Sequence, residues 1–153
     1  MQVLLYFWIV KKEKIDYRSN CPISTALDIF GDKWSLLIVR DLAFKGLHTY
    51  GDFLNGGEKI ATNTLADRLL ILEMGGIITK HPHPDSKAKF LYQLTDKGIN
   101  LVPTLVEMII WSEQHHDVDA QATRFVGELQ QDKAGVIKSI MANLRQAPQP
   151  PSP

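Results

Sequence analysis

The sequence predicts a mainly α-helical protein with one small β-hairpin, and three observations carry this prediction. Apolar residues recur at helical spacing through most of residues 22–144, whereas strict alternation is confined to a short stretch around residue 92. Glycine pairs and capping residues divide the helical pattern into short segments. The chain has 153 residues, of which 44% are apolar and 22% charged, as in an ordinary globular domain. We therefore expect one compact domain with short appendages.

Two helices are expected between residues 22 and 42. Pro22 suits the first position of a helix, and apolar residues follow at i, i+4 and i+7 spacing before Gly31 ends the segment. Asp32 can then cap a second helix. The broad apolar stripe of this second helix, with Asp41 beside it, is predicted to lie in the core.

A short helix, a tight turn and a longer helix come next. Thr49 and Asp52 have the spacing of a capping box, and the helix that they open must end before the turn at residues 55–57. A second helix is predicted over residues 61–74, and the glycine pair after it marks its end. One side of this helix is apolar and carries Leu65, Leu69 and Leu72.

The hairpin is predicted from two short alternating segments. Its strands are expected at residues 77–81 and 90–95, and Phe90, Tyr92 and Leu94 should point inward. The polar segment between them, residues 82–89, is predicted to be a mobile tip.

The C-terminal third is predicted to be helical. Asp96 can cap a long helix that runs to about Trp111, with a bend at Pro103. The apolar stripe between residues 125 and 144 would be left in water on a lone helix, so we expect it to pack on a partner. The last residues, 147–153, are low in complexity and predicted to be disordered.

The predicted order of elements is that of a winged helix-turn-helix, in which the helix after the turn enters DNA and the hairpin is the wing. A major groove about 12 Å wide admits one helix, and Asn at the start of that helix can bind adenine bidentately. The candidate DNA-binding residues lie just before this helix, in its first two turns and at the hairpin tip: Lys59, Thr62, Asn63, Thr64, Arg68, Lys87 and Lys89.

Net charge does not by itself favour DNA binding, because 17 basic and 17 acidic residues cancel. Basic residues outnumber acidic ones between residues 59 and 89, and protonated His81 and His83 would add to the excess. Against this, Thr and Asn are common helix caps, and Asp67 would repel phosphate unless it accepts from cytosine or pairs with Arg68. From the residues alone, a DNA contact and a purely structural role both stay open.

The chain carries no sign of secretion or of a membrane anchor. A single cysteine cannot form a disulfide within the chain, which fits a reducing cytoplasm. The apolar stretch at residues 3–10 is too short to cross a bilayer and lacks the flanks of a signal peptide. We expect it to form part of a dimer interface or of the core.

Several motifs in order resemble one known family. Cys21-Pro22, the stretch Leu27 to Arg40, the run Ile60 to Leu69 and the run Tyr92 to Gly98 resemble the HxlR-type winged helix-turn-helix transcriptional regulators of bacteria. The resemblance implies a homodimer, joined through N-terminal and C-terminal helices, on a palindromic or near-palindromic double-stranded DNA operator. The sequence as a whole divides into four regions: an N-terminal apolar segment (1–20), the DNA-binding domain (21–117), an amphipathic helical extension (118–146) and the tail (147–153). The resemblance covers the second region, whereas the apolar segment and the extension exceed the usual length of the family.

Cys21 is a candidate sensor residue. It precedes a helix start, where the backbone N–H groups favour a thiolate. The resemblance implies a role in sensing, because some family members detect oxidants or small electrophiles at this Cys-Pro position, by alkylation or by a disulfide between subunits. The alternative is a small buried packing residue.

Other classes of function find little support. No glycine-rich phosphate loop, serine elbow or zincin histidine pair is present, so we expect neither an enzyme nor a cofactor. The pairs His81/His83 and His115/His116 suggest a metal only weakly, and we predict no metal site. The remaining alternative is a winged helix that binds another protein instead of DNA.

Overall fold

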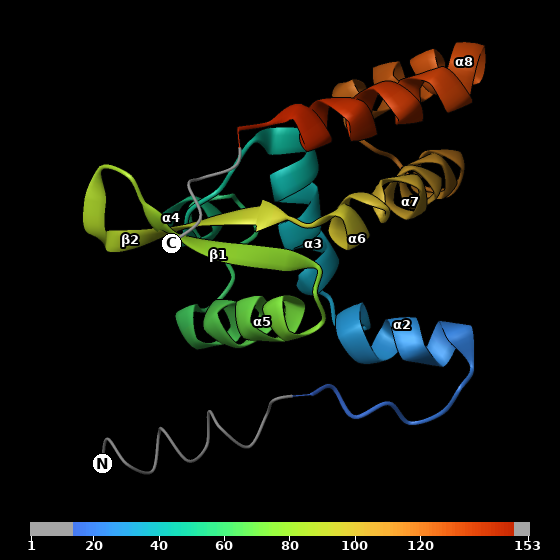
Figure 1. Ribbon diagram of the computed structural model, residues 1–153. Helices are drawn as coiled ribbons and strands as arrows, with labels where there is room; N and C mark the ends of the chain where they lie inside the picture. The colour runs from blue at the N-terminus through green and yellow to red at the C-terminus, as the bar shows by residue number, and fades with distance from the viewer. Residues whose placement is uncertain (1–13, 149–153) are drawn as a thin grey trace.

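The protein is built around one central helical rod. The structure, a computed structural model, describes residues 14–148. The rod consists of α3 (Ser35–Arg40), which continues as the π-helical segment η1 (Asp41–Lys45). The two-stranded sheet and α5 lie on one side of the rod, and the C-terminal helices lie on the other side and across its end (Figure 1). The predicted fold class, mainly α with a β-hairpin wing, is confirmed.

The first helices begin and end where the sequence places them. α2 (Pro22–Phe30) starts at its proline and ends at a glycine C-cap. Asp32 caps the rod, since its carboxylate accepts hydrogen bonds from the Trp34 N–H at 2.8 Å and the Ser35 N–H at 3.0 Å. The short helix α4 (Tyr50–Leu54) opens with the predicted capping box, in which the side chains of residues 49 and 52 accept from each other's backbone N–H.

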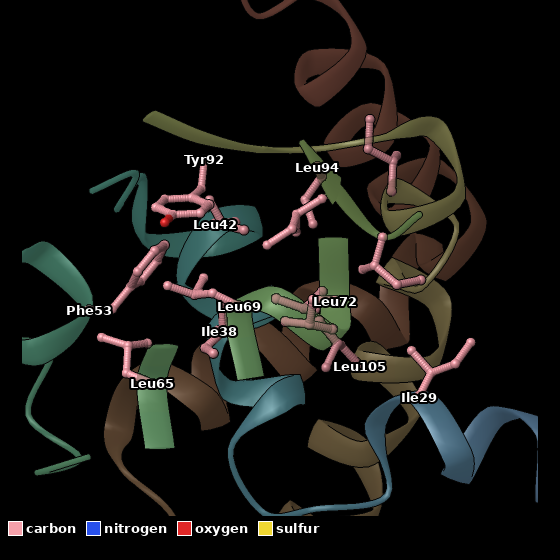
Figure 2. Packing of buried hydrophobic residues seen from close by; sticks show 14 residues of the cluster. Ile29, Ile38, Leu42, Phe53, Leu65, Leu69, Leu72, Tyr92, Leu94 and Leu105 are labelled. Carbon is pink, nitrogen blue, oxygen red and sulfur yellow. The ribbon is translucent and has the colours of Figure 1, made fainter. Parts of the chain in front are cut away.

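α5 (Thr62–Met74) lies against the core through the predicted leucines. Leu65 and Leu72 are completely buried, and Leu69 is 3% exposed. Figure 2 shows these side chains meeting residues from the rod, the hairpin and α4, including Ile38, Leu42 and Phe53. The core therefore fixes which side of α5 faces outward.

The hairpin is longer and less loop-like than predicted. β1 (Ile78–His83) and β2 (Ser86–Leu94) pair antiparallel, with a register irregularity at Pro82/His83, so the turn is reduced to residues 84 and 85. The expectation of a loop over residues 82–89 is wrong, because most of that segment is strand. Tyr92 and Leu94 point inward as expected, but Phe90 is 44% exposed because it lies where the hairpin extends beyond the core.

The single long helix predicted from Asp96 is in fact two helices. α6 (Asp96–Ile99) is capped by Thr95, whose hydroxyl accepts from the backbone N–H of Gly98. α7 (Val102–His115) begins separately, with Pro103 in its first turn. Proline has no N–H to continue the α-helical ladder, so the predicted bend becomes a break.

α8 (Ala120–Gln146) is interrupted at Asp132, whose backbone is not helical (φ −152°, ψ 74°). Its carboxylate accepts from the N–H of Gly135 at 2.9 Å and so starts the second half, which turns back over the first (Figure 1). Apolar residues of both halves join Val102 and Val106 of α7 in one buried cluster: Phe125, Leu129, Val136, Ile137 and Ile140. The stripe is therefore not left in water, as would be expected for a lone helix, because it packs on α7 of its own chain.

Two sequence expectations fall outside the described residues. The apolar segment at residues 3–10 and the end of the tail, residues 149–153, are not part of the description. Of the tail, the Pro148 carbonyl accepts a hydrogen bond from the Gln93 side chain at 3.0 Å.

Candidate nucleic-acid interface

The outward side of α5 carries polar side chains at its N-terminal end. Thr62 and Asn63 are exposed, and Thr64 is half-buried. The N-cap is Ala61, in extended conformation and without a side-chain cap. Within residues 14–148 no hydrogen bond engages the Thr62 hydroxyl or the Asn63 amide, so the first turn presents both groups to solvent. These side chains therefore do not serve as caps, the structural role that the sequence had left open.

Neighbouring elements hold the start of α5 in place. The Tyr50 hydroxyl donates to the Thr62 carbonyl at 2.7 Å. Arg40, the last residue of α3, reaches the turn before α5, where its Nη1 donates to Glu58 at 2.8 Å. Its Nε and Nη2 donate to the buried carboxylate of Asp41 at 2.8 and 2.7 Å. Burial alone would lower the pKa of Arg40, but these two carboxylates outweigh burial and raise it. Sequence analysis missed this bracing, because its partners come from separate elements.

Arg68 is held by the protein rather than presented to solvent. Its guanidinium pairs with Asp67 and lies 3.4 Å from Asp32 of the α3 cap. Burial alone would raise the pKa of Asp32, but the Ser35 hydroxyl, the N–H groups of Trp34 and Ser35 and the Arg68 charge together lower it. The charge of Arg68 is thus cancelled within the fold. The sequence had left the pairing of Asp67 with Arg68 undecided.

The remaining predicted cations lie around α5. Lys87 and Lys89 are exposed on β2, and Lys89 also lines a hollow of about 530 Å³ between the wing and α4. Lys59 is exposed in the turn with a left-handed backbone (φ 57°). The exposed face of α5 also includes Ala66, which sequence analysis missed although it is one turn beyond Asn63.

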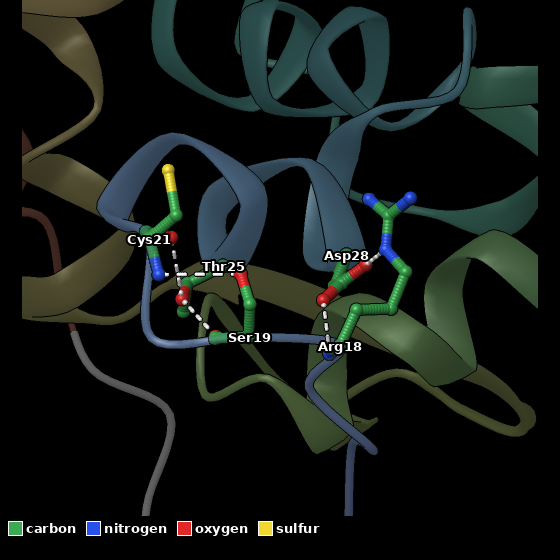
Figure 3. Close-up of polar contacts among 5 residues, drawn as sticks. All are labelled: Arg18, Ser19, Cys21, Thr25 and Asp28. Atoms are coloured by element: carbon green, nitrogen blue, oxygen red, sulfur yellow. Dashed lines mark hydrogen bonds and ion pairs between the residues drawn. The ribbon is translucent and has the colours of Figure 1, made fainter.

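Cys21 is exposed, so the prediction of a buried packing residue is wrong. It occupies the N-cap position of α2. The Cys21 N–H donates a hydrogen bond to the Ser19 hydroxyl, and the Thr25 hydroxyl donates to the Cys21 carbonyl (Figure 3). Nearby, Arg18 Nε donates to the Asp28 carboxylate. The sulfur points away from these polar groups, which leaves it accessible to a reagent.

Large apolar side chains are exposed on two helices. Ile23 and Leu27 of α2 are 70% and 49% exposed, and Met108 and Trp111 of α7 are 48% and 57% exposed. The i, i+4 and i, i+3 spacings put each pair on one helix face. In Figure 1 both helices lie on the side of the molecule away from the tip of the wing.

Neither a metal cluster nor a membrane-spanning helix is found among residues 14–148. Among residues 14–148, no three His, Cys, Asp or Glu side chains gather as a metal site would require. Of the predicted histidine pairs, His81 contacts the Thr79 hydroxyl and His115 packs on Trp111. No helix in this part of the chain is long and apolar enough to cross a bilayer.

Comparison with known proteins adds family membership. Residues 29–120 match the model of the HxlR-like helix-turn-helix family. The HTH-type transcriptional regulator sll1512 of Synechocystis is 38% identical over 88 residues, 58% of this chain but just under two thirds (64%) of the relative. The structure of PA1607, a putative transcription factor, superposes with a TM-score of 0.60 at 40% identity, covering 67% of this chain and 70% of that one. The redox regulator HypR in its oxidized form gives 0.57 at 28% identity, covering 64% and 100%. With the helix-turn-helix geometry, these matches show that the chain belongs to the HxlR-like family of winged helix-turn-helix transcriptional regulators.

Proposed function

We propose that the protein is a homodimeric, sequence-specific regulator that binds a near-palindromic operator in double-stranded DNA through α5, in the cytoplasm. The observation that carries the proposal is the orientation of α5. Its three leucines are buried, and its first turn presents Thr62 and Asn63 to solvent. An amphipathic helix held in this way can enter a major groove with its polar end toward base edges. Lys59, Thr64, Lys87 and Lys89 then contact or approach the backbone.

Selection of duplexes from a random DNA pool tests this proposal. We expect bound sequences with two-fold symmetry and half-sites about one helical turn apart. Asn63→Ala should relax base preference at one position per half-site by about 1–3 kcal/mol, while the exposed control Asn143→Ala on α8 should not. Failure to enrich any duplex, or binding that does not respond to salt, would instead favour a winged helix that binds a protein.

The homodimer is proposed from the exposed apolar faces of α2 and α7. Ile23 and Trp111 lie among the most exposed large apolar side chains of the described chain, and such faces mark association surfaces. Sedimentation should give twice the chain mass of 17.3 kDa for the wild type. Ile23→Glu or Trp111→Glu should shift this toward the monomer, whereas Phe90→Glu on the wing should not. A wild-type monomer at micromolar concentration would contradict the proposal.

The signal is proposed to act at Cys21. The thiol is exposed and precedes α2, whose apolar face is assigned to the dimer interface, and the similar HypR is a redox regulator. Two such thiols, one per subunit, can form a disulfide, and diamide takes up the two protons and two electrons released. A quinone would instead add to a single sulfur. Either reagent should change operator affinity in the wild type and leave Cys21→Ser unchanged. Equal responses of the two proteins would end this part of the proposal.

A further inference from the structure

Two hollows flank the exposed face of α5. The first, of about 470 Å³, lies between residues 32–34 at the start of the rod and the side of α5 that carries Asn63 and Thr64. The second, of about 260 Å³, lies on the opposite flank, between Lys80 of β1 and Ala66. Each flank therefore carries one lysine from a neighbouring element. The lysine of the first hollow is Lys33, which no sequence motif had singled out for binding.

This arrangement matches the surroundings of a helix in a major groove. The groove is bordered by two phosphate backbones, and phosphate contacts fix the register and orientation of the protein on the duplex. Cations are therefore needed on both sides of the inserted helix. On the β1 side, the wing and its lysines meet this need. On the α3 side, the cations that line the hollow are Lys33 and Arg68.

Of these two cations, only Lys33 has a charge that is available to bind a phosphate. Arg68 is paired with Asp67 and Asp32, so its charge is already cancelled. None of the ion pairs formed within residues 14–148 involves Lys33. Its ammonium instead lies 4.8 Å from the centre of the Trp34 ring, a contact that orients the side chain without neutralising it.

We propose that Lys33 binds a phosphate of the DNA backbone on the α3 flank of α5, with Trp34 holding its side chain in position. This inference rests on the proposed function, since it names a contact made by the same interface. Arg68 acts as the structural counter-ion of Asp32 and Asp67, which would otherwise repel the phosphate. Lys33 thus takes the role that the sequence gave to Arg68.

The test is the salt dependence of binding to a selected operator duplex. Each phosphate contact contributes about 0.9 to the slope of log affinity against log salt. A homodimer presents this lysine twice, so loss of both contacts should reduce the slope by about 1.8, which is roughly a thirtyfold loss of affinity at 0.15 M salt relative to 1 M. We expect this for Lys33→Gln. Lys33→Arg, which keeps the charge, should restore the slope, and Lys138→Gln, at an exposed site on α8, should behave as the wild type. The base preference should be the same in all three variants.

The outcomes separate the inference from the function on which it rests. If the wild type binds DNA with a steep salt slope but Lys33→Gln has the same slope, the inference is wrong and the proposed function stands. If Lys33→Gln changes base preference instead of slope, Lys33 contacts a base and the phosphate contact is refuted. If the wild type binds no duplex, the proposed function is wrong, and the Lys33 contact that depends on it is wrong as well. Circular dichroism of the variants checks that each is folded.

Discussion

Truncation of a single leucine on each side of α5 tests its orientation, on which the interface depends. Leu65 is completely buried, whereas Leu70, five residues later, is half-buried and lines a surface hollow of about 260 Å³. Leu65→Ala removes three buried carbons, worth about 2.4 kcal/mol at roughly 0.8 kcal/mol each. The cavity left behind adds to this, so the free energy of unfolding should fall by about 3–4 kcal/mol. Leu70→Ala should cost under about 1 kcal/mol, because the site can be filled by water.

Urea unfolding followed by circular dichroism measures both losses. The protein concentration must be the same in every sample, because dimer formation shifts apparent stability by mass action. In a thermal scan, the loss for Leu65→Ala corresponds to a fall in Tm of roughly 10 °C. Equal losses for the two variants, or a loss under about 1 kcal/mol for Leu65→Ala, would refute the orientation of α5 and with it the exposed first turn.

Three further predictions concern caps and glycines. Burial alone would raise the pKa of Asp52, but hydrogen bonds from the Thr49 backbone and hydroxyl and from the backbone N–H at position 48 lower it. The Asp52 carboxylate therefore contributes to the free energy of unfolding above about pH 4, and this contribution is lost as the pH falls further. Urea unfolding should show the difference in free energy between the wild type and Asp52→Asn becoming smaller in acid. Gly98→Ala would drive a methyl group into the Ile77 carbonyl and should cost at least about 2 kcal/mol in urea unfolding. Gly46→Ala has open space around it but a left-handed backbone (φ 63°), so a loss of only about 1 kcal/mol is expected, and a gain would contradict the strain argument.

Signals that act within a few residues of each other predicted most of the fold. The capping box at Thr49, the glycine after α2 and the leucine spacing of α5 each concern neighbouring residues, and the structure confirms all three. The hairpin boundaries were wrong because strands that extend beyond the core are polar on both faces and show no alternation. The break at Asp132 was not predicted, although its carboxylate caps the second half of α8, because the apolar spacing before and after it fits a single helix.

The interface could be predicted only in part, for a related reason. Asn63 and its neighbours follow from the local pattern of α5. The state of Arg68 depends on Asp32, which is far from it in sequence and reaches it only through packing of the rod on α5. The same packing brings Lys33 beside the first turn of α5. The excess of basic residues along the sequence therefore indicated the region of the interface, but not which basic side chain is available to bind a phosphate.

The return of α8 over the rod has a consequence for how the chain folds during synthesis. Met141 and Leu144 join the clusters that contain Ala43 and Phe44, and Arg145 binds Asp96 at 2.7 Å. Part of the cover over the end of η1 thus comes from residues that are synthesised long after it. A nascent chain that has released everything up to α7 still carries bare apolar surface, so ribosomes that stall or stop early would yield aggregation-prone products rather than a working half-protein.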